Sequence, residues 1–481
     1  MRQRRIAILL PLWREHNVIG EMLDHNLGVI RYGKYDFFVG VYPNDWLTIR
    51  AVQRVVRNHS HVHLAICPHI GPTSKADCLN RAYHGMTEHE GRCGVRYEIV
   101  VTHDAEDLIH PESLRLINWF SRAYEMVQVP VLPLPTGLRE WTHGLYCDEF
   151  AEYQSKDIPA RQKLGGFVPS NGVGTGFARA ALERLRAEHG HVFDPECLTE
   201  DYENGFRVHA AGYRQIFLPV RRIGPIATRE YFPGHWRAAV RQRSRWVAGI
   251  ALQGWQRHGW GANSTQFYWF WRDRKGLIGN LLSPLANVTM IYWLASQALP
   301  GHRDSLTDPA NLFPVWASWM CLACAWVALV QAGMRAHLSA RIYGWRFAAA
   351  SPLRTVWGNL INCAATVEAL RLFAVARLKH RALSWRKTEH VYPGEPLHVH
   401  SRPRLGEVLV SLRYLSMEEL EDALARRPPG LRIGEYLIQL DKITRRDLGN
   451  ALKSQAGLRV KAANGRKPAH GAHRNFGLDS T

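Results

Sequence analysis

The sequence lacks a cysteine spacing that would indicate a disulfide framework. Eight cysteines are scattered over 481 residues, and Cys321 and Cys324 form a C-x-x-C inside an apolar run. Two buried small residues are a better interpretation of that pair than a redox or zinc site. The cysteines therefore require no oxidising compartment.

Acidic residues are scarce beside basic ones, with 42 Asp and Glu against 61 Lys and Arg and a formal net charge of +19. Such a balance favours anionic partners, which include nucleic acids, anionic membranes and phosphorylated substrates. The basic residues gather around the apolar runs and in the C-terminal tail, without a nucleic-acid-reading motif. We therefore expect no nucleic-acid partner.

A signal-peptide cleavage site is also missing. The start, MRQRRIAILLPLW, is basic, but its apolar stretch is short and Arg14, Glu15 and His16 follow at once. We interpret this segment as a first β-strand and not as a targeting segment.

The first 230 residues instead alternate short apolar strands with helical stretches. This order predicts an α/β, doubly wound domain, in which ligands bind beyond the carboxyl ends of the strands. Polar loops follow three of the expected strands, so we expect these loops to converge on one edge of the sheet. The strands are expected at residues 6–10, 36–42, 62–66 and 97–101, and the loops are PLWRE (11–15), YPND (42–45) and HDAED (103–107).

Three carboxylates, those of Asp104, Glu106 and Asp107, crowd the last of these loops. Carboxylates that lie so close together repel one another unless a positive charge lies among them. Asp104 and Glu106 can both reach one hard cation, and Mg²⁺ and Mn²⁺ prefer such oxygen ligands. A metal site at the end of the strand is one interpretation, and a solvated turn is the other.

Two further motifs carry groups suited to sugar or phosphate chemistry. Glu200 and Asp201 follow Thr199 where a helix is expected to begin, and Thr is a competent N-cap. An ordinary acidic first turn is the alternative. The Q-x-x-R-W motif places Gln242, Arg245 and Trp246 on one amphipathic helix. Arg can bind phosphate through two donors, and Trp can stack on a sugar ring or pack in a core.

Charges are missing from two long runs, residues 276–299 and 312–334. As a helix, either run is long enough to cross a bilayer. Basic residues on the outer flanks of the two runs favour a cytoplasmic position for both flanks. The stretch 348–378 contains charged residues, so we expect an interfacial or re-entrant helix there, with a third span as the alternative.

The C-terminal part contains an internal repeat. RLGEVLVSLRYLSMEELEDAL (404–424) aligns with RIGEYLIQLDKITRRDLGNAL (432–452) at an offset of 28 residues. Two matched units predict a small, mainly helical module. The Gly-, Lys- and His-rich tail after it is expected to be disordered.

Taken in order, these features resemble the family 2 glycosyltransferases over about residues 5 to 260. The resemblance extends to their membrane-bound, processive branch, which includes the cellulose and hyaluronan synthases. Within that branch, REYFPGHW, RQRSRWVAGIALQGW and WRKTEH (385–390) are similar to the phage adsorption protein B family of the bacterial inner membrane. The matched positions are Pro11 and Glu15 after the first strand, Asp45, Lys75 in SKADCLN, and the D-A-E-D, T-E-D and Q-x-x-R-W motifs.

The resemblance implies a GT-A fold and a role for each matched residue. Asp45 would contact the uridine of a UDP-sugar, with Lys75 nearby. Asp104 and Glu106 would hold Mg²⁺ or Mn²⁺ on the diphosphate. Asp201 would be the general base that deprotonates the acceptor hydroxyl, so that a single displacement inverts the anomeric centre.

The remaining matched residues would bind substrate. Gln242, Arg245 and Trp246 would line the acceptor and diphosphate side, and the glycine-rich segment 170–182 would floor the acceptor pocket, a phosphate loop being the alternative. The substrate-binding set also includes Pro11, Glu15 and Glu200.

The implied protein is a multi-pass enzyme of the bacterial inner membrane, with its catalytic and C-terminal domains in the cytoplasm. It would extend a polysaccharide or another glycan acceptor. A transferase that adds one sugar to a lipid or protein is one alternative, and a non-catalytic receptor or scaffold that senses cyclic di-GMP is another.

The sequence departs from the family pattern in three ways. Glu106 stands where Asp is usual, although the longer side chain should still reach a metal. Relatives generally have membrane helices before the first strand, so this chain either lacks them or is truncated. Two spans are few for a polysaccharide channel, so we expect an export partner protein.

The C-terminal repeat resembles the N-terminal module of type II secretion and pilus ATPases, which binds cyclic di-GMP in several relatives. A Gly that is usual later in each repeat is Arg413 in the first and Asp441 in the second. A degenerate interaction module is therefore the alternative to a binding site. The residues that match the two repeat openings are Arg404, Leu405 and Gly406, and Arg432, Ile433 and Gly434.

The expected organisation has six segments. They are a glycosyltransferase core at 1–230, an interfacial region with Q-x-x-R-W at 231–272, membrane and interfacial helices at 273–380, a linker at 381–403, the repeat module at 404–458 and the tail at 459–481.

Overall fold

The computed structural model describes residues 2–220, 225–298, 315–379, 405, 409, 412, 414–428 and 431–452. The chain divides into two compact units, Met1–Tyr392 and Pro393–Thr481. The expected glycosyltransferase core and the helices that follow it therefore belong to one unit. The boundaries of the six expected segments stay a prediction.

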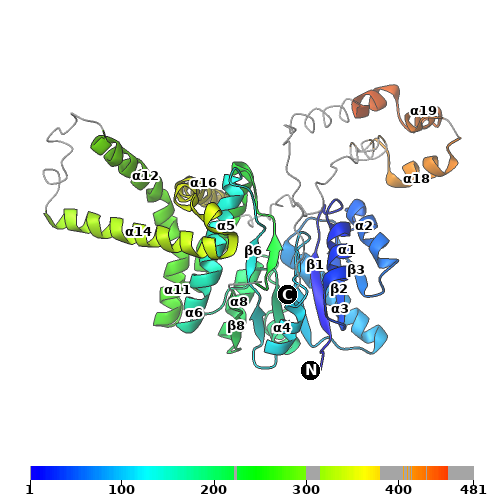
Figure 1. Cartoon of the computed structure of the whole chain (residues 1–481). Coiled ribbons are helices and arrows are strands. Elements are labelled where there is room, and N and C mark those ends of the chain that lie inside the picture. Colours follow the sequence, from blue (N-terminus) through cyan, green and yellow to red (C-terminus); the bar gives the residue numbers. More distant parts are fainter. Residues whose placement is uncertain are drawn as a thin grey trace, which may run out of the picture. The chain divides into compact units, whose positions relative to one another are not determined.

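A seven-stranded mixed sheet forms the centre of the first unit, in the order β3-β2-β1-β4-β7-β5-β8 (Figure 1). The four expected strands are present as parallel neighbours, and β7 runs antiparallel to β4 and β5. The expected α/β fold class is confirmed. The bounds are β1 Ile6–Pro11, β2 Tyr35–Val41, β3 Val62–Ile66, β4 Ile99–Thr102, β5 Met126–Gln128, β7 Thr175–Ala178 and β8 Gln215–Phe217, and a second sheet pairs β6 Val131–Pro133 with β9 Thr228–Glu230.

Helices cover both faces of the main sheet because successive side chains of a strand point to opposite faces. In β1, Ile6 and Ile8 pack on the face with α1, α2 and α4, while Ala7 and Leu9 pack on the face with α3, α7 and α8. Burial on both faces explains why the strands read as continuous apolar runs. These helices are α1 Ile19–Val29, α2 Trp46–Val56, α3 Lys75–Cys93, α4 Ser113–Phe120, α7 Arg179–His189 and α8 Glu200–Ala210.

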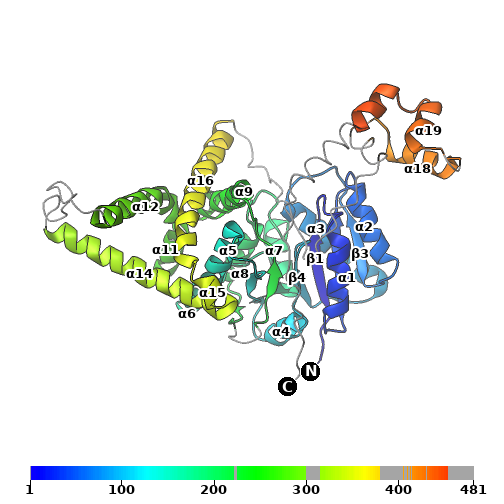
Figure 2. The same ribbon diagram turned by 45° about the horizontal axis from the view of Figure 1, so that its top comes forward.

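Two further helical rods flank the carboxyl edge, and each contains a π-helical segment. The first rod runs through α5 (Trp141–Glu152), η1 (Tyr153–Asp157) and α6 (Ile158–Lys163). The second runs through α9 (Trp236–Trp246), η2 (Val247–Gln253) and α10 (Gly254–His258) (Figure 2). Such π-segments occur frequently at functional sites.

Where the structure describes the rest of the first unit, it is largely helical. Two of these described helices are long and apolar enough to cross a membrane, Trp319–Tyr343 in α14 and Ser351–Leu378, which is α16. The other bounds are α11 Ser264–Arg274, α12 Gly276–Ala298, α14 Val315–Tyr343 and α15 Trp345–Ala348.

The first of the two apolar helices overlaps the expected run 312–334, and the second is the stretch 348–378, where a third span was the alternative. The expected span at 276–299 stays a prediction. The Nδ2 of Asn280 in α12 donates to the Oγ1 of Thr366 in α16 at 3.0 Å. In α16, Arg354 is buried inside the protein, so its charge does not face the surroundings. The sequence shows the charge but not where it points.

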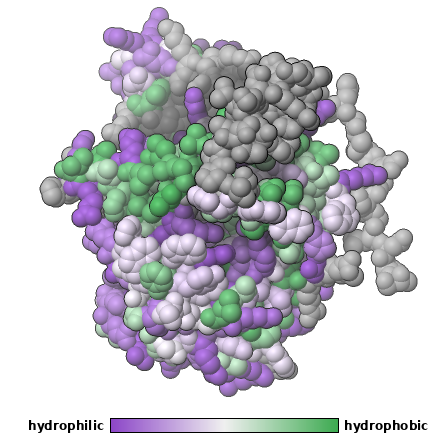
Figure 3. Space-filling model, turned by 90° about the vertical axis from the view of Figure 1, so that its left-hand side faces the viewer, coloured by the Kyte–Doolittle hydropathy of each residue, from purple (hydrophilic) through white to green (hydrophobic). Residues whose placement is uncertain are grey.

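Hydrophobic side chains gather in a band across the side of the molecule that Figure 3 presents. On α14, Trp319, Leu322 and Trp326 are exposed, Trp326 by 68%. Cys321 and Cys324 are exposed on the same helix, so the prediction that they are buried is wrong. A contiguous apolar surface of this kind marks contact with another apolar surface or phase.

The second unit has helices α18 (Met417–Arg426) and α19 (Ile433–Gln439) around a small apolar core. Ser416 and Glu419 form a capping box, in which each side chain accepts from the other's backbone N–H. Thr444 and Asp447 repeat that reciprocal pair 28 residues later. The repeated sequence therefore folds with a repeated helix start.

Candidate active site

A pocket of about 510 Å³ lies in the first unit, beside the loop after β4. A smaller pocket of about 50 Å³ adjoins it, and Lys75, Asp104 and Arg245 line both. Pro11 and Glu15 line the smaller pocket, next to Tyr42. The expected site residues that line the larger pocket are Lys75, Asp104, Glu106, Asp201, Gln242, Arg245 and Trp246.

Lys75 supplies a positive charge among the carboxylates. It is the first residue of α3, whose N-cap Ser74 accepts from the backbone N–H of Asp77 at 3.2 Å. Its Nζ donates to Asp104 Oδ2 at 2.6 Å and lies 3.8 Å from Glu200 Oε1. Burial alone would lower the pKa of Lys75, but Asp104, Glu200 and Asp201 raise it above its usual value. The ammonium group therefore stays charged and offsets the repulsion.

The three carboxylates after β4 have different surroundings. Asp107 is fully buried, and its Oδ2 is 2.6 Å from His103 Nδ1 and accepts from the backbone N–H of Asp104 at 3.0 Å. Asp107 therefore shapes the loop and does not face the pocket. Asp104 and Glu106 both line the pocket.

Asp104 and Glu106 fit a hard divalent cation by the chemistry of their oxygens. Within the described part of the chain, no group of three or more His, Cys, Asp or Glu side chains is arranged to hold a metal. Mg²⁺ usually binds to one or two carboxylates and completes its shell with water and substrate phosphates. Two carboxylates facing one pocket meet that requirement.

Asp201 enters the same pocket from the first turn of α8. Its Oδ1 accepts from the backbone N–H of Tyr202 at 2.7 Å. Burial raises the pKa of the Asp201 carboxyl, and that of Glu200 to about 7, while Lys75 opposes both shifts. Thr199 holds the expected N-cap position, but its side chain makes no capping hydrogen bond.

The glycine-rich segment before β7 lies close to the Asp201 carboxylate. Gly172 has φ +79°, and a Cβ there would lie 2.8 Å from Asp201 Oδ2. The backbone can approach the carboxylate this closely only without a side chain. The segment therefore lies against Asp201, and Ser170 and Asn171 line the pocket beside it.

The Q-x-x-R-W residues reach the pocket from α9. Gln242 Oε1 and Arg245 Nε have no hydrogen-bond partner within the described part of the chain, although both atoms are buried from solvent. Trp246 packs against the rings of Tyr146 and Phe150, with centroids 6.2 and 6.4 Å away. Unsatisfied polar atoms at a pocket are the ones a ligand can satisfy.

Asp45 and Glu200 lie outside both pockets. The Oδ2 of Asp45 accepts from the backbone N–H of Arg14, which ties the loops after β1 and β2 together. Glu200 is buried behind Lys75. The structure thus brings most of the expected residues together and keeps these two apart from the cavities.

The matched residues of the C-terminal repeat are described in part. Arg404 and Gly406 lie outside the described residues. Arg432 is the N-cap of α19 and makes no side-chain cap. A Cβ at Gly434 would lie 2.7 Å from Leu448 and 3.1 Å from Leu405, so close packing by itself requires a glycine there.

Several pocket residues carry no motif that sequence analysis could single out. Most of them come from the first helical rod and from α14, while Tyr202 lies in α8 and Asp273 in α11. The one available signal was the cluster of acidic residues in DEFAEYQSKD (148–157). The missed residues are Glu149, Glu152, Tyr153, Asp157, Tyr202, Asp273 and Arg335.

Comparison with known proteins gives one family match and two curated relatives. The model of the family described as "Glycosyltransferase like family 2" matches residues 3–249. Bacteriophage adsorption protein B of Escherichia coli K12 is 37% identical over 490 aligned positions, covering 95% of this chain and 64% of the relative. Bacteriophage N4 adsorption protein B of Escherichia coli O157:H7 matches with the same values. The chain thus spans 64% of the length of these relatives, less than two thirds.

Solved structures show a more distant likeness. A mannosyltransferase from Pyrobaculum calidifontis, in complex with GDP-Man and Mn²⁺, is 18% identical with a TM-score of 0.44, over 74% of this chain and 88% of that one. A fragment of TarS from S. aureus is 11% identical with a TM-score of 0.33, over 76% and 91% of the two chains.

Proposed function

The chain belongs to glycosyltransferase-like family 2, and from this membership and the pocket we propose that it transfers a sugar from a UDP-sugar to a growing polysaccharide or other glycan acceptor. The observation that carries the proposal is one shared cavity. The acidic pair after β4, the first-turn aspartate of α8 and the Q-x-x-R-W residues all line it.

The proposed mechanism is an inverting displacement. Asp104 and Glu106 would hold Mg²⁺ or Mn²⁺, which when bound would offset the charge that develops on the leaving diphosphate. Asp201 accepts the proton of the acceptor hydroxyl as that oxygen attacks the anomeric carbon, and its raised pKa makes it a better base near neutral pH. Arg245, which lines both pockets, supplies donors for the diphosphate. Trp246 and Gln242 border the acceptor side.

The smaller pocket is the proposed place of the nucleotide. Tyr42, Pro11 and Glu15 form part of its wall, and Lys75 and Asp104 connect it to the metal site. We propose that Asp45 contributes to the nucleotide site, because its carboxylate accepts from the backbone N–H of Arg14 and so ties the loops after β1 and β2 together. In this proposal Glu200 contributes by holding Lys75, whose Nζ lies 3.8 Å from Glu200 Oε1 and which lines the smaller pocket.

We propose a bacterial inner-membrane location, with the catalytic and C-terminal parts in the cytoplasm. The two apolar helices support this, as do exposed aromatic side chains on α11, among them Phe267 and Trp271. Trp and Tyr are enriched where a protein meets the membrane interface. Membrane lipid is then a partner, and an export partner protein would carry a polysaccharide product.

The repeat module is the proposed regulatory part, through cyclic di-GMP. Two matched repeats with the same helix start support it, and Arg432 offers a guanidinium group for phosphate. The close packing of Gly434 is an alternative explanation for the glycine.

Purified full-length protein offered a panel of UDP-sugars with Mg²⁺ or Mn²⁺ is expected to release UDP from at least one donor. Chelation by EDTA should abolish that release, because the paired carboxylates need a cation to neutralise the diphosphate. Cyclic di-GMP is expected to increase the rate. A coupled UDP assay measures the release with each donor, its loss on chelation and its increase with cyclic di-GMP. Added Ca²⁺ is the control cation. Failure to release UDP with any donor would remove the support for an enzyme.

Gly172→Ala is expected to lower UDP release by about 10-fold to 100-fold, because the new Cβ displaces the Asp201 carboxylate. Gly190→Ala is the matched control. Gly190 has φ +80° at the C-terminus of α7, and a Cβ there meets no atom within 4 Å. Both glycines have a positive φ, so each alanine adds backbone strain and should lower the unfolding temperature, while only Gly172→Ala also loses rate. Equal loss of rate in both would show that strain alone is responsible.

The two alternatives predict different products. A single-sugar transferase would give a product of one added residue with a lipid or protein acceptor, which mass spectrometry of the product distinguishes from a polymer. A scaffold that only senses cyclic di-GMP would turn over no UDP-sugar at all.

A further inference from the structure

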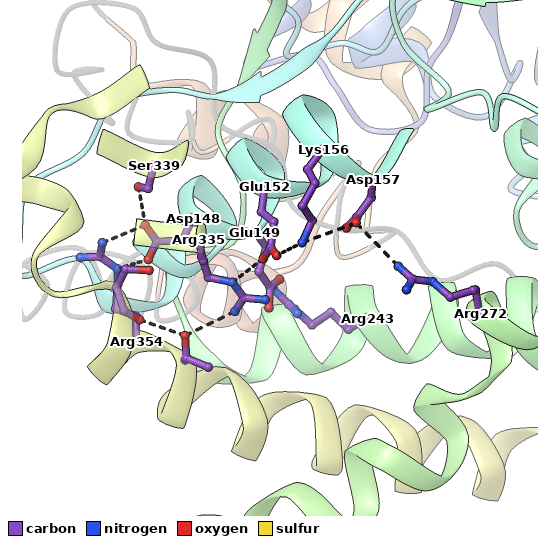
Figure 4. Close-up of polar contacts among 12 residues, drawn as sticks. Asp148, Glu149, Glu152, Lys156, Asp157, Arg243, Arg272, Arg335, Ser339 and Arg354 are labelled. Atoms are coloured by element: carbon purple, nitrogen blue, oxygen red, sulfur yellow. Dashed lines mark hydrogen bonds and ion pairs between the residues drawn. The ribbon is translucent and has the colours of Figure 1, made fainter. Parts of the chain in front are cut away.

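Three carboxylates in one helix, α5, bind arginines from three later helices (Figure 4). Asp148 binds Arg354 of α16, with Oδ2 to Nε at 2.7 Å. Glu149 binds Arg243 of α9 at 2.6 Å. Glu152 binds Arg335 of α14, with Oε2 to Nε at 2.7 Å. The helix thus connects the Q-x-x-R-W helix to both apolar helices.

Of these arginines, Arg335 and Arg243 also line the larger pocket. Arg335 comes from the part of α14 that is long and apolar enough to cross a membrane. Its Nη1 also lies 3.4 Å from Thr355 Oγ1 of α16. One guanidinium group therefore contacts α5 and α16 and borders the cavity.

Glu152 is the last residue of α5, directly before the π-helix η1. Its other carboxylate oxygen, Oε1, accepts from Lys156 within η1. Lys156 Nζ is in turn 3.7 Å from Asp157 Oδ1. Tyr153 and Asp157 of η1 line the pocket. The ion pair between Arg335 and Glu152 is therefore linked through Lys156 to a residue of the pocket wall.

This wall borders the larger pocket and not the smaller one. The residues shared with the smaller pocket, Lys75, Asp104 and Arg245, mark the donor end. Arg335, Glu152 and Asp157 line the larger pocket alone, as do Trp246, Glu106 and Asp201. If the donor occupies the shared end, the wall formed by η1 and α14 is left for the acceptor.

We propose that Arg335 is a positioning residue for the acceptor: through Glu152 it fixes η1 and so couples α14 to the acceptor side of the pocket. This rests on the proposed transferase function. The proposed acceptor is a molecule with many hydroxyls, such as a sugar chain, which the carboxylates of Glu152 and Asp157 and the bordering aromatic rings recognise. Arg335 itself takes no part in the bond-making step.

Arg335→Gln tests the coupling without removing all charge compensation from Glu152, because Lys156 remains bound to it. With the active UDP-sugar, and with its free monosaccharide and the corresponding disaccharide as acceptors, we expect the acceptor KM to rise by about tenfold. The donor KM should stay within about twofold, and the melting temperature within about 3 °C. Arg335→Lys, which keeps a positive charge, should recover part of the acceptor affinity.

Arg371→Gln is the control, because Arg371 pairs with Glu368 at 2.7 Å on the exposed side of α16 and lines neither pocket. It should leave both KM values unchanged. A second variant, Glu152→Gln, should raise the acceptor KM as Arg335→Gln does.

Two outcomes would overturn the coupling. One is that Arg335→Gln and Glu152→Gln leave the acceptor KM at the wild-type value. The other is that they lower kcat only in proportion to the folded fraction, which a purely structural role predicts. Absence of turnover in the wild-type protein would instead refute the proposed function, so the two failures are distinguishable.

Discussion

Asp201→Asn is expected to lower UDP release by about 10²-fold to 10⁴-fold, the range that a positioned base contributes. Asn has nearly the same shape, and its Oδ1 can still accept from the backbone N–H of Tyr202. It cannot take the proton of the acceptor hydroxyl. The coupled UDP assay measures the rate, and thermal unfolding verifies the fold.

The unfolding temperature of Asp201→Asn should not fall. Burial raises the pKa of this carboxyl, so the charged form is disfavoured in the folded protein, and a neutral amide removes that penalty. Glu203→Gln is the control on the same helix, since Glu203 faces His258 with 2.8 Å between Oε2 and Nε2 and lies outside the pocket. Wild-type turnover in Asp201→Asn would assign the base to another residue.

Arg354→Met is expected to cost about 3–5 kcal/mol in the free energy of unfolding, the largest effect on stability that we predict. The side chains of Arg354 and Asp148 are 1% and 0% exposed, and two hydrogen bonds of 2.7 and 3.0 Å join them. Ser339 of α14 donates to the same carboxylate at 2.6 Å. Without Arg354, the Ser339 hydroxyl is the side-chain donor that remains to the buried Asp148 carboxylate among the described residues.

The double variant Asp148→Leu with Arg354→Met should recover most of the lost stability, because it removes both charges from the interior. Denaturant unfolding of the detergent-solubilised protein measures each variant. Arg371→Met, at an exposed ion pair on α16, is the control and should change stability far less. If the single and double variants were equally unstable, the loss would come from packing and not from an unpaired charge.

The strands and the acidic loops could be predicted because their signals are local. Each parallel strand is a short apolar run, and the polar residues that follow it are adjacent in sequence. That Lys75, Asp104 and Asp201 lie near one another could then be predicted from the rule that ligands bind beyond the carboxyl ends of the strands. Their convergence on one pocket agrees with that rule.

What the sequence could not show depends on long-range pairing. Asp148 and Arg354 are 206 positions apart, and neither residue carries a local sign that the other neutralises it. For that reason Arg354 argued against an apolar span at 348–378, although the structure buries its charge. The antiparallel direction of β7 and the two π-segments likewise follow from tertiary contacts.

The π-segment η1 makes the length of the first rod a constraint on the protein. Each residue of a helix turns the next side chain by about 100°, so removing one residue from η1 would rotate everything after it by that angle. Arg161 in α6 would then swing away from Asp273, which it now holds by two hydrogen bonds of 2.9 and 3.0 Å. Homologous chains should therefore tolerate insertions and deletions in loops but not between Glu152 and Arg161.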